Sequence, residues 1–132
     1  MSLQIFIADD DPDDVELLEE AILEQEPTSA VAIATNGKTA IEKLDQLRDD
    51  ELPHLIILDY NMPGLGGCAI LDHLATLARY RNIPRVMLST SDAELYKREC
   101  LEKGATDYFV KPSTKKDLDA IAGQMIDIAL KP

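Results

Sequence analysis

Four short apolar runs, far apart in the chain, each end at a residue whose side chain can take part in chemistry. The runs are Leu3–Ala8 before Asp9 and Asp10, Leu55–Leu58 before Asp59, Val86–Leu88 before Ser89, and Tyr108–Val110 before Lys111. If these runs are parallel strands of one sheet, their carboxyl ends lie together, and the crevice outside those ends is where an open α/β sheet binds its ligands. The pattern therefore predicts one site with three acids, a hydroxyl and a lysine.

Apolar runs alternate with longer segments of helical period along the whole chain. This alternation is typical of repeated βα units, in which helices cover a parallel sheet. The predicted strands span residues 3–9, 30–34, 54–59, 85–89 and 106–110. Three of them are nearly unbroken apolar runs, as expected for strands that are buried on both faces. The expected fold class is therefore α/β.

Local signals mark the ends of several predicted helices. Asp11 is the expected N-cap of the first helix, with Pro12 at its first position. The segment Ser91–Glu94 has the spacing of a capping box, and Thr114 stands in the same way before the fifth helix. The third helix is expected from about residue 68 to residue 80.

Composition narrows the class of protein. With 132 residues and 45% hydrophobic content, the chain suits one domain that buries its own core. A net charge of −12 without a Lys and Arg cluster opposes direct binding to nucleic acid. No run approaches the roughly 20 apolar residues of a membrane helix, and Cys68 and Cys100 have no metal-ligand spacing. We therefore expect a cytoplasmic protein with reduced thiols and no membrane contact.

The predicted crevice gathers Asp9, Asp10 and Asp59, and three carboxylates in one place repel one another unless a cation lies between them. A site rich in oxygen, without thiolate or imidazole, suits Mg²⁺, with Mn²⁺ as a second candidate. An Asp at a strand end can also act as a nucleophile toward a phosphoryl donor, and Asp59 is the candidate because it ends a central strand alone. Lys111 and the Ser89 hydroxyl would then bind oxygens of the transferred group.

Taken together, these residues closely resemble the receiver domains of two-component response regulators, from about Ile5 to Leu130. The matching residues are Asp9-Asp10, the segment Leu58-Asp59-Tyr60-Asn61-Met62-Pro63-Gly64 followed by Gly66-Gly67, Ser89, and Lys111-Pro112 preceded by Gly104-Ala105 and Tyr108. The resemblance implies a flavodoxin-like (βα)5 three-layer sandwich with a parallel sheet in the order 2-1-3-4-5. It also implies one receiver domain over residues 1–132, with no output domain.

The resemblance implies a role for each acid of the site. Asp59 resembles the phosphoacceptor, which is also a metal ligand. Asp10 resembles the direct Mg²⁺ ligand, and Asp9 the acid that holds metal-bound water. Asn61 would contribute its backbone carbonyl to the metal.

The remaining matches imply a switch. Lys111 would bind the phosphoryl group, and its bond to Pro112 would be cis. Ser89 would swing toward the phosphoryl group while the ring of Tyr108 moves inward, which changes the surface of the fourth helix, fifth strand and fifth helix. The protein would catalyse only its own phosphorylation and dephosphorylation, so it is not expected to be an enzyme.

Three residues would control access to the site, namely Tyr60, Thr90 and Ser91. Thr90 departs from the small residue that is common in the family, and its β-branched side chain could narrow the approach to Asp59. A register shifted by one residue would make Thr90 the switch hydroxyl, although counting from Pro84 favours Ser89.

The implied partners are a sensor histidine kinase or a phosphotransfer protein, and an unknown downstream protein. A homodimer through the fourth helix, fifth strand and fifth helix is a further candidate assembly. One alternative is a degenerate receiver that acts only as a binding module. Another is a phosphatase of the haloacid-dehalogenase type, but such enzymes need a second Asp two positions after the nucleophile, where this chain has Asn61.

Overall fold

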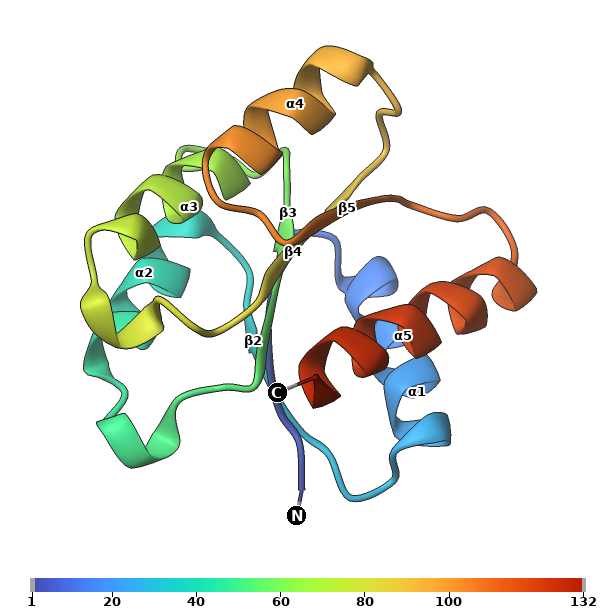
Figure 1. The fold of residues 1–132 in the computed structure, drawn as a ribbon. Coiled ribbons are helices and arrows are strands. Elements are labelled where there is room, and N and C mark those ends of the chain that lie inside the picture. Colours follow the sequence, from blue (N-terminus) through green and yellow to red (C-terminus); the bar gives the residue numbers. More distant parts are fainter. Residues whose placement is uncertain (1, 132) are drawn as a thin grey trace.

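The computed structural model describes residues 2–131. Five parallel strands form one sheet in the order β2-β1-β3-β4-β5, with helices on both faces (Figure 1). This order confirms the predicted flavodoxin-like architecture. The elements in chain order are β1 (Gln4–Ala8), α1 (Pro12–Gln25), β2 (Ala30–Ala34), α2 (Gly37–Gln46), β3 (Leu55–Asp59), α3 (Gly67–Ala75), β4 (Arg85–Ser89), α4 (Glu94–Glu102), β5 (Asp107–Val110) and α5 (Lys115–Leu130), with 3₁₀ turns at Asp49–Glu51 and Ala78–Tyr80.

The sheet separates two apolar cores. Side chains alternate along each strand, so neighbouring residues of β1 face opposite layers. Phe6 and Ala8 join the core under α2, α3 and α4, whereas Ile5 and Ile7 join the core under α1 and α5. Both faces are therefore covered, which explains why β3 and β4 are buried along their whole length.

Two of the three predicted helix starts are confirmed by their caps. The Asp11 side chain accepts hydrogen bonds from the backbone of the first turn of α1, and Thr114 caps α5 through the amide of Asp117. The predicted capping box before α4 is wrong. The hydroxyl of Ser91 accepts from the amide of Ala93, and α4 begins at Glu94 without any side-chain cap.

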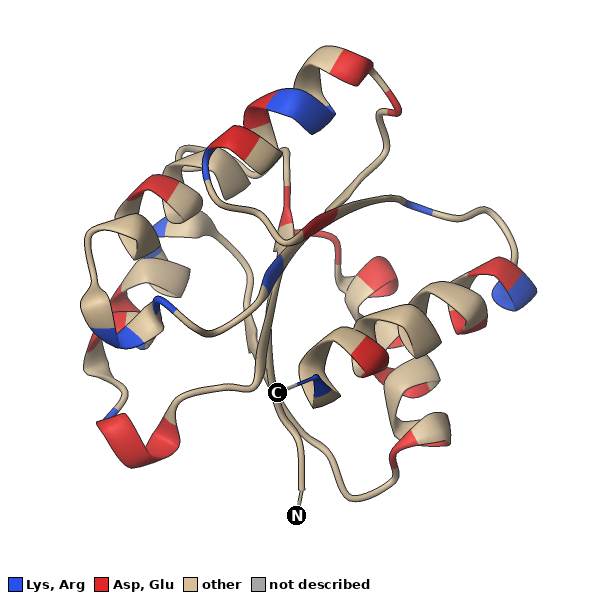
Figure 2. Ribbon diagram, viewed as in Figure 1, with Lys and Arg blue, Asp and Glu red and all other residues tan. Residues whose placement is uncertain are grey.

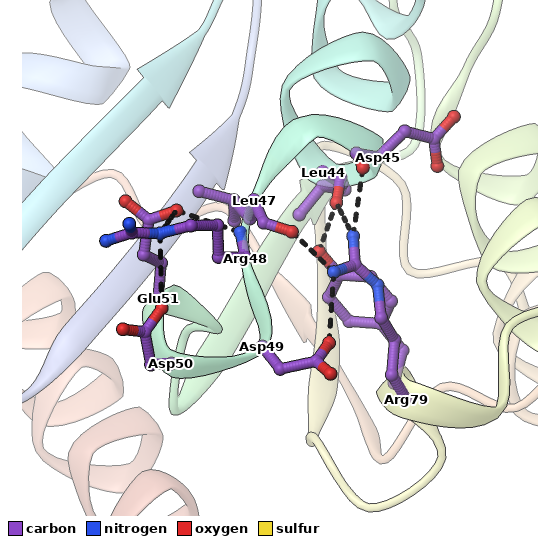
Figure 3. Close-up of polar contacts among 9 residues, drawn as sticks. Leu44, Asp45, Leu47, Arg48, Asp49, Asp50, Glu51 and Arg79 are labelled. Atoms are coloured by element: carbon purple, nitrogen blue, oxygen red, sulfur yellow. Dashed lines mark hydrogen bonds and ion pairs between the residues drawn. The ribbon is translucent and has the colours of Figure 1, made fainter.

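The third helix ends earlier than predicted, at Ala75, because the following residues bind the end of α2. The last carbonyls of a helix have no partner within the helix. The Arg79 guanidinium donates to the carbonyl of Leu44 at 2.7 Å and to that of Asp45 at 3.1 Å, and it also donates to the carbonyl of Leu47 (Figure 3). The hydroxyl of Tyr80 donates to the same Leu44 carbonyl at 2.5 Å. With Arg79 and Tyr80 bound to α2, the chain does not continue α3 but forms a 3₁₀ turn at Ala78–Tyr80.

Charged residues lie mainly on the helices and the loops, and the strands carry few of them (Figure 2). Acidic positions occur on most of the helices, in keeping with a net charge of −12. Within residues 2–131, no helix has both the length and the apolar character that crossing a bilayer requires.

Candidate phosphoryl-transfer site

The predicted site residues meet at one edge of the sheet. Asp59 is the last residue of β3 and Ser89 the last residue of β4, while Lys111 directly follows β5. The strand registers pair Asp59 with Leu88 and Ser89 with Val110, so these carboxyl ends are level with one another. The juxtaposition that the apolar runs predicted is therefore present.

Three carboxylates form the centre of the site. Asp9, Asp10 and Asp59 each offer an oxygen, and these oxygens all lie within 4.8 Å of one another. Asp9 and Asp59 are buried, with 3% and 5% of their surface exposed, whereas Asp10 is exposed. The site is therefore open to solvent on the side of Asp10.

Backbone amides fix the orientation of the two buried acids. The carboxylate of Asp9 accepts from the amide of Asp11 at 2.9 Å, and that of Asp59 accepts from the amide of Asn61 at 3.3 Å. The loop after β3 is also held closely, since a Cβ atom at Gly67 would lie 2.5 Å from the carbonyl oxygen of Asp59. Only glycine allows α3 to begin at this place.

Lys111 lies among the carboxylates. Its amine is 3.1 Å from Asp9 Oδ2, 3.6 Å from Asp59 Oδ2 and 2.9 Å from Asp14 Oδ2. The lysine side chain is 13% exposed, so solvent screens these contacts weakly. One cation thus compensates three acids that come from two different segments of the chain.

The electrostatic balance of the site makes Asp59 harder to ionise than an ordinary aspartate. Burial and the nearby charge of Asp9 raise the pKa of Asp59 to about 7, although Lys111 and the amide of Asn61 lower it. Burial lowers the pKa of Lys111, but the hydrogen bond to Asp14 and the charges of Asp9 and Asp59 outweigh it and raise that pKa above its ordinary value. Lys111 therefore stays charged, and its single charge does not fully neutralise the acids.

The acidic centre fits a hard divalent cation. Oxygen ligands of Mg²⁺ lie about 2.1 Å from the ion, so oxygens a few ångströms apart can share one ion. The carboxylate oxygens, all within 4.8 Å of one another, lie close to the separation of about 4.2 Å that such ligand distances allow, and no sulfur or imidazole contributes to the cluster. The donor set therefore suits Mg²⁺ or Mn²⁺.

A hydrogen-bonded path joins the two predicted switch residues through Ser91. The amide of Ser91 donates to the hydroxyl of Ser89 at 3.1 Å, and the hydroxyl of Tyr108 donates to the carbonyl of Ser91 at 2.6 Å. Ser89 is fully buried and Tyr108 is 9% exposed. The loop after β4 thus contacts both residues.

The predicted cis bond between Lys111 and Pro112 is wrong, since this peptide bond is trans. Trans is the intrinsically favoured isomer even before proline, by about 0.5–1 kcal/mol. The amide of Lys111 donates to the carbonyl of Ser89 at 2.7 Å, which extends the pairing of β5 with β4. The lysine therefore reaches the acids with an ordinary backbone.

The residues expected at the entrance differ in their surroundings. Thr90 is exposed, immediately after the buried Ser89. The ring of Tyr60 stacks on Tyr96 of α4, with 4.8 Å between the ring centroids, and its hydroxyl donates to Glu99 at 3.5 Å. Tyr60, which directly follows Asp59, therefore connects the end of β3 to α4.

Sequence reasoning missed Asp14, which makes the shortest of the three contacts with Lys111. Asp14 lies in the first turn of α1, where a carboxylate also interacts favourably with the helix dipole. A carboxylate five residues after Asp9 lies on the turn above the site, and this spacing is the one signal in the sequence that could have indicated it.

Comparisons with known sequences agree on one kind of protein. The family described as "Response regulator receiver domain" matches residues 5–122. The two-component response regulator ORR3 of rice is 33% identical over 96 residues, which cover 73% of this chain and 71% of that protein. A 14.6 kDa protein of Leptolyngbya boryana is 30% identical over 122 residues, or 92% of this chain and 88% of that one.

Solved structures give the same result. The phosphorylated cyanobacterial phytochrome response regulator RcpA has a TM-score of 0.89 and 25% identity, over 99% of this chain and 96% of that chain. The Mn²⁺-bound form of the response regulator Rcp1 has a TM-score of 0.83 and 26% identity, over 98% of this chain and 95% of that chain.

Proposed function

The chain belongs to the response regulator receiver family, which makes it a phosphoacceptor switch of a two-component system, and from this premise we propose that Asp59 is the residue that accepts the phosphoryl group. The observation that carries the proposal is the position of Lys111, whose amine lies within 3.6 Å of Asp59 and 3.1 Å of Asp9. Such a cation beside a strand-end carboxylate suits a group that receives three negatively charged oxygens. Asp59 also lies at the carboxyl end of β3, the middle strand of the sheet.

Each residue has one task in the transfer. A carboxylate oxygen of Asp59 attacks the phosphorus of a phosphohistidine, the bond from phosphorus to nitrogen breaks, and the leaving imidazole takes a proton from water. The amine of Lys111 and the hydroxyl of Ser89 donate to oxygens of the transferred group. Ser89 is favoured over Thr90 for this task because it is buried at the end of β4, whereas Thr90 is exposed.

We place the divalent cation at the carboxylates of Asp10 and Asp59 and the backbone carbonyl of Asn61, with Asp9 acting through a water molecule. When bound, Mg²⁺ or Mn²⁺ would supply the positive charge that the carboxylates and a phosphoryl group need. The acidic cluster supports this assignment. So does the Mn²⁺-bound form of the similar regulator Rcp1.

Phosphorylation would act on other proteins by changing a surface that they contact. Ser89 and Tyr108 meet the same residue, Ser91, so a movement of the hydroxyl toward a phosphoryl group would change the loop before α4. We propose that α4, β5 and α5 present the altered surface, either to a downstream protein or to a second copy of the chain. The phosphoryl donor would be a histidine kinase or a phosphotransfer protein in the cytoplasm.

The family match over residues 5–122 and the single sheet support one receiver domain over residues 1–132. The acidic surface, with a net charge of −12, makes direct contact with nucleic acid unfavourable. The proposed output is therefore an interaction between proteins.

Phosphorylation of Asp59 is tested by incubation with acetyl phosphate and Mg²⁺, followed by intact mass. We expect the wild type to gain one phosphoryl group, and Asp59→Asn to gain none because it lacks the attacking carboxylate. Asp92→Asn, an exposed acid just beyond the site, is the matched control and should label as the wild type does.

The alternatives give different results in this experiment. A degenerate receiver would show no mass gain in the wild type with any donor. A phosphatase would release phosphate continuously without accumulating the modified protein. Labelling of Asp59→Asn to the level of the wild type would disprove the proposed acceptor.

Thr90→Ala is expected to label several-fold faster than the wild type with acetyl phosphate. The smaller side chain leaves more room for a donor at the solvent side of the site, because Thr90 is exposed beside the buried Ser89. The rate of mass gain under limiting donor measures the effect. Equal or slower labelling of the variant would show that Thr90 does not restrict access.

A further inference from the structure

The two cysteines of the chain meet although 32 positions separate them. Cys68 lies in the first turn of α3 and Cys100 near the end of α4, and their sulfur atoms are 3.8 Å apart. Cys100 is fully buried, whereas Cys68 is half-buried. Nothing in the phosphoryl-transfer chemistry uses either thiol.

The cysteine pair lies where α4 packs against α3. Cys100 is the one residue of α4 that is fully enclosed, and the start of that helix has no side-chain cap. Tyr96 of α4 also stacks on Tyr60, and Lys103, directly after α4, forms an ion pair of 3.0 Å with Asp72 of α3. The thiol contact therefore joins the one buried side chain of α4 to the first turn of α3.

From this geometry we propose that Cys68 and Cys100 form a peroxide-oxidised disulfide site that ties α4 to α3. The sulfur atoms would have to approach by roughly 1.8 Å to reach a disulfide length of about 2.05 Å. Rotation of the two side chains and a small shift of α4 can supply this movement, since few side chains anchor that helix.

The two thiols differ in their access to an oxidant, which sets the order of the steps. The thiol of half-buried Cys68 loses its proton, and its sulfur attacks hydrogen peroxide. The O–O bond breaks, and the released hydroxide takes up a proton, so that sulfenic acid and water form. The thiol of Cys100 then loses its proton and attacks the Cys68 sulfur, so that the S–S bond forms, the S–O bond breaks and a second water leaves. Two thiols and one peroxide thus give one disulfide and two waters.

The surroundings make the reduced pair slow to react. Burial raises the pKa of Cys68, and the neighbouring Cys100 and Glu99 raise it further. Burial likewise raises the pKa of Cys100. Both groups are therefore protonated thiols at neutral pH, and the reduced form should persist until the peroxide concentration is high.

The disulfide is tested by counting thiols in the full-length protein. Wild-type protein is exposed to hydrogen peroxide at pH 8, denatured, and alkylated with iodoacetamide with and without prior treatment with dithiothreitol. We expect both thiols to be lost to alkylation and regained after dithiothreitol, with Cys68 and Cys100 joined in one non-reduced peptide. Denaturing electrophoresis of the unreduced sample should show no covalent dimer, because the bond lies within one chain.

Cys68→Ala is the matched control, since it leaves the buried Cys100 without a neighbouring thiol. We expect this variant to keep its alkylatable thiol under the same exposure. The proposal is overturned if both wild-type thiols remain alkylatable, if they are oxidised without a linked peptide, or if the link joins two chains.

The effect on α4 is measured by hydrogen exchange. Amides of residues 94–102 should exchange several-fold more slowly in the oxidised protein than in the reduced one, while those of α1 remain unchanged. Equal exchange in both forms would show that the bond does not hold α4. That a held helix also blocks the output surface rests on the proposed function, but neither measurement involves phosphorylation, so failure of one proposal is distinguishable from failure of the other.

Discussion

Lys111→Met is expected to lower the free energy of unfolding by about 2–4 kcal/mol when divalent cations are removed. The substitution keeps the aliphatic length of the side chain but removes the charge that compensates Asp9, Asp14 and Asp59. Asp9 and Asp59 are almost completely buried, so water screens the repulsion between their carboxylates poorly. Urea unfolding in EDTA, followed by circular dichroism, measures the change.

The matched control is Lys115→Met, which removes the same charge four residues later. Lys115 also contacts two acids, Glu24 at 3.1 Å and Asp119 at 3.0 Å, but its side chain is 67% exposed. Exposed pairs contribute about 0–1 kcal/mol, so this variant should differ little from the wild type. Added Mg²⁺ should recover part of the loss in Lys111→Met, because a bound cation replaces the missing charge. An equal effect of the two substitutions would show that Lys111 does not compensate the acidic site.

Asp59→Asn is expected to have the opposite sign and to stabilise the metal-free protein, by about 1–3 kcal/mol at pH 8. Burial and the charge of Asp9 raise the pKa of Asp59 to about 7 in the folded state. The ionised carboxylate is therefore less stable in the folded protein than in the unfolded chain. Asparagine fills nearly the same volume without that charge, so the penalty disappears.

The pH dependence of this gain has a definite direction. The unfolded pKa of Asp is about 4, so between about pH 4 and pH 7 the folded wild type binds more protons than the unfolded chain and loses stability as pH rises. The advantage of Asp59→Asn should therefore be full above pH 7 and shrink as the pH falls toward 4. Urea unfolding in EDTA at pH 8 and pH 5 measures it, with Asp92→Asn as the exposed control. A gain that stays constant with pH would rule out the titration of Asp59 as its cause.

Together the two variants separate two properties of the site. Lys111 is expected to stabilise the acidic cluster, whereas Asp59, the proposed phosphoacceptor, is expected to reduce that stability. A buried acid that costs stability is common at functional sites, where the required charge is not the most stable arrangement. The opposite signs of the two effects would therefore support the proposed function independently of phosphorylation.

Features that depend on a few neighbouring residues were predicted well. Each strand was placed within one residue of its observed ends, because short apolar runs that alternate with longer segments of helical period favour the strands of βα units. The caps by Asp11 and Thr114 were also confirmed, since the side chain and the amides that it binds lie within three residues. The resemblance to the receiver family supplied the strand order.

Predictions of helix ends failed where residues take part in hydrogen bonds with residues far away in the sequence. Ser91 has the spacing of a helix cap, but its carbonyl accepts from Tyr108, and its hydroxyl binds an amide before the helix begins. The third helix was predicted too long because Arg79 and Tyr80 bind the end of α2 instead. In each case a contact across the fold outweighs a weak local preference.

The sequence by itself determined the sheet, its covered faces and the gathering of acids, hydroxyl and lysine at one edge, because strand direction carries the chemistry at each strand end to the same side. Two contacts were decided by the tertiary structure alone. These are the ion pair of Lys111 with Asp14 and the contact of Cys68 with Cys100. Those contacts depend on how helices settle against each other and against the sheet. Helix packing fixes distances between side chains only after the whole core has formed, so the spacing of these residues along the chain does not by itself establish the contacts.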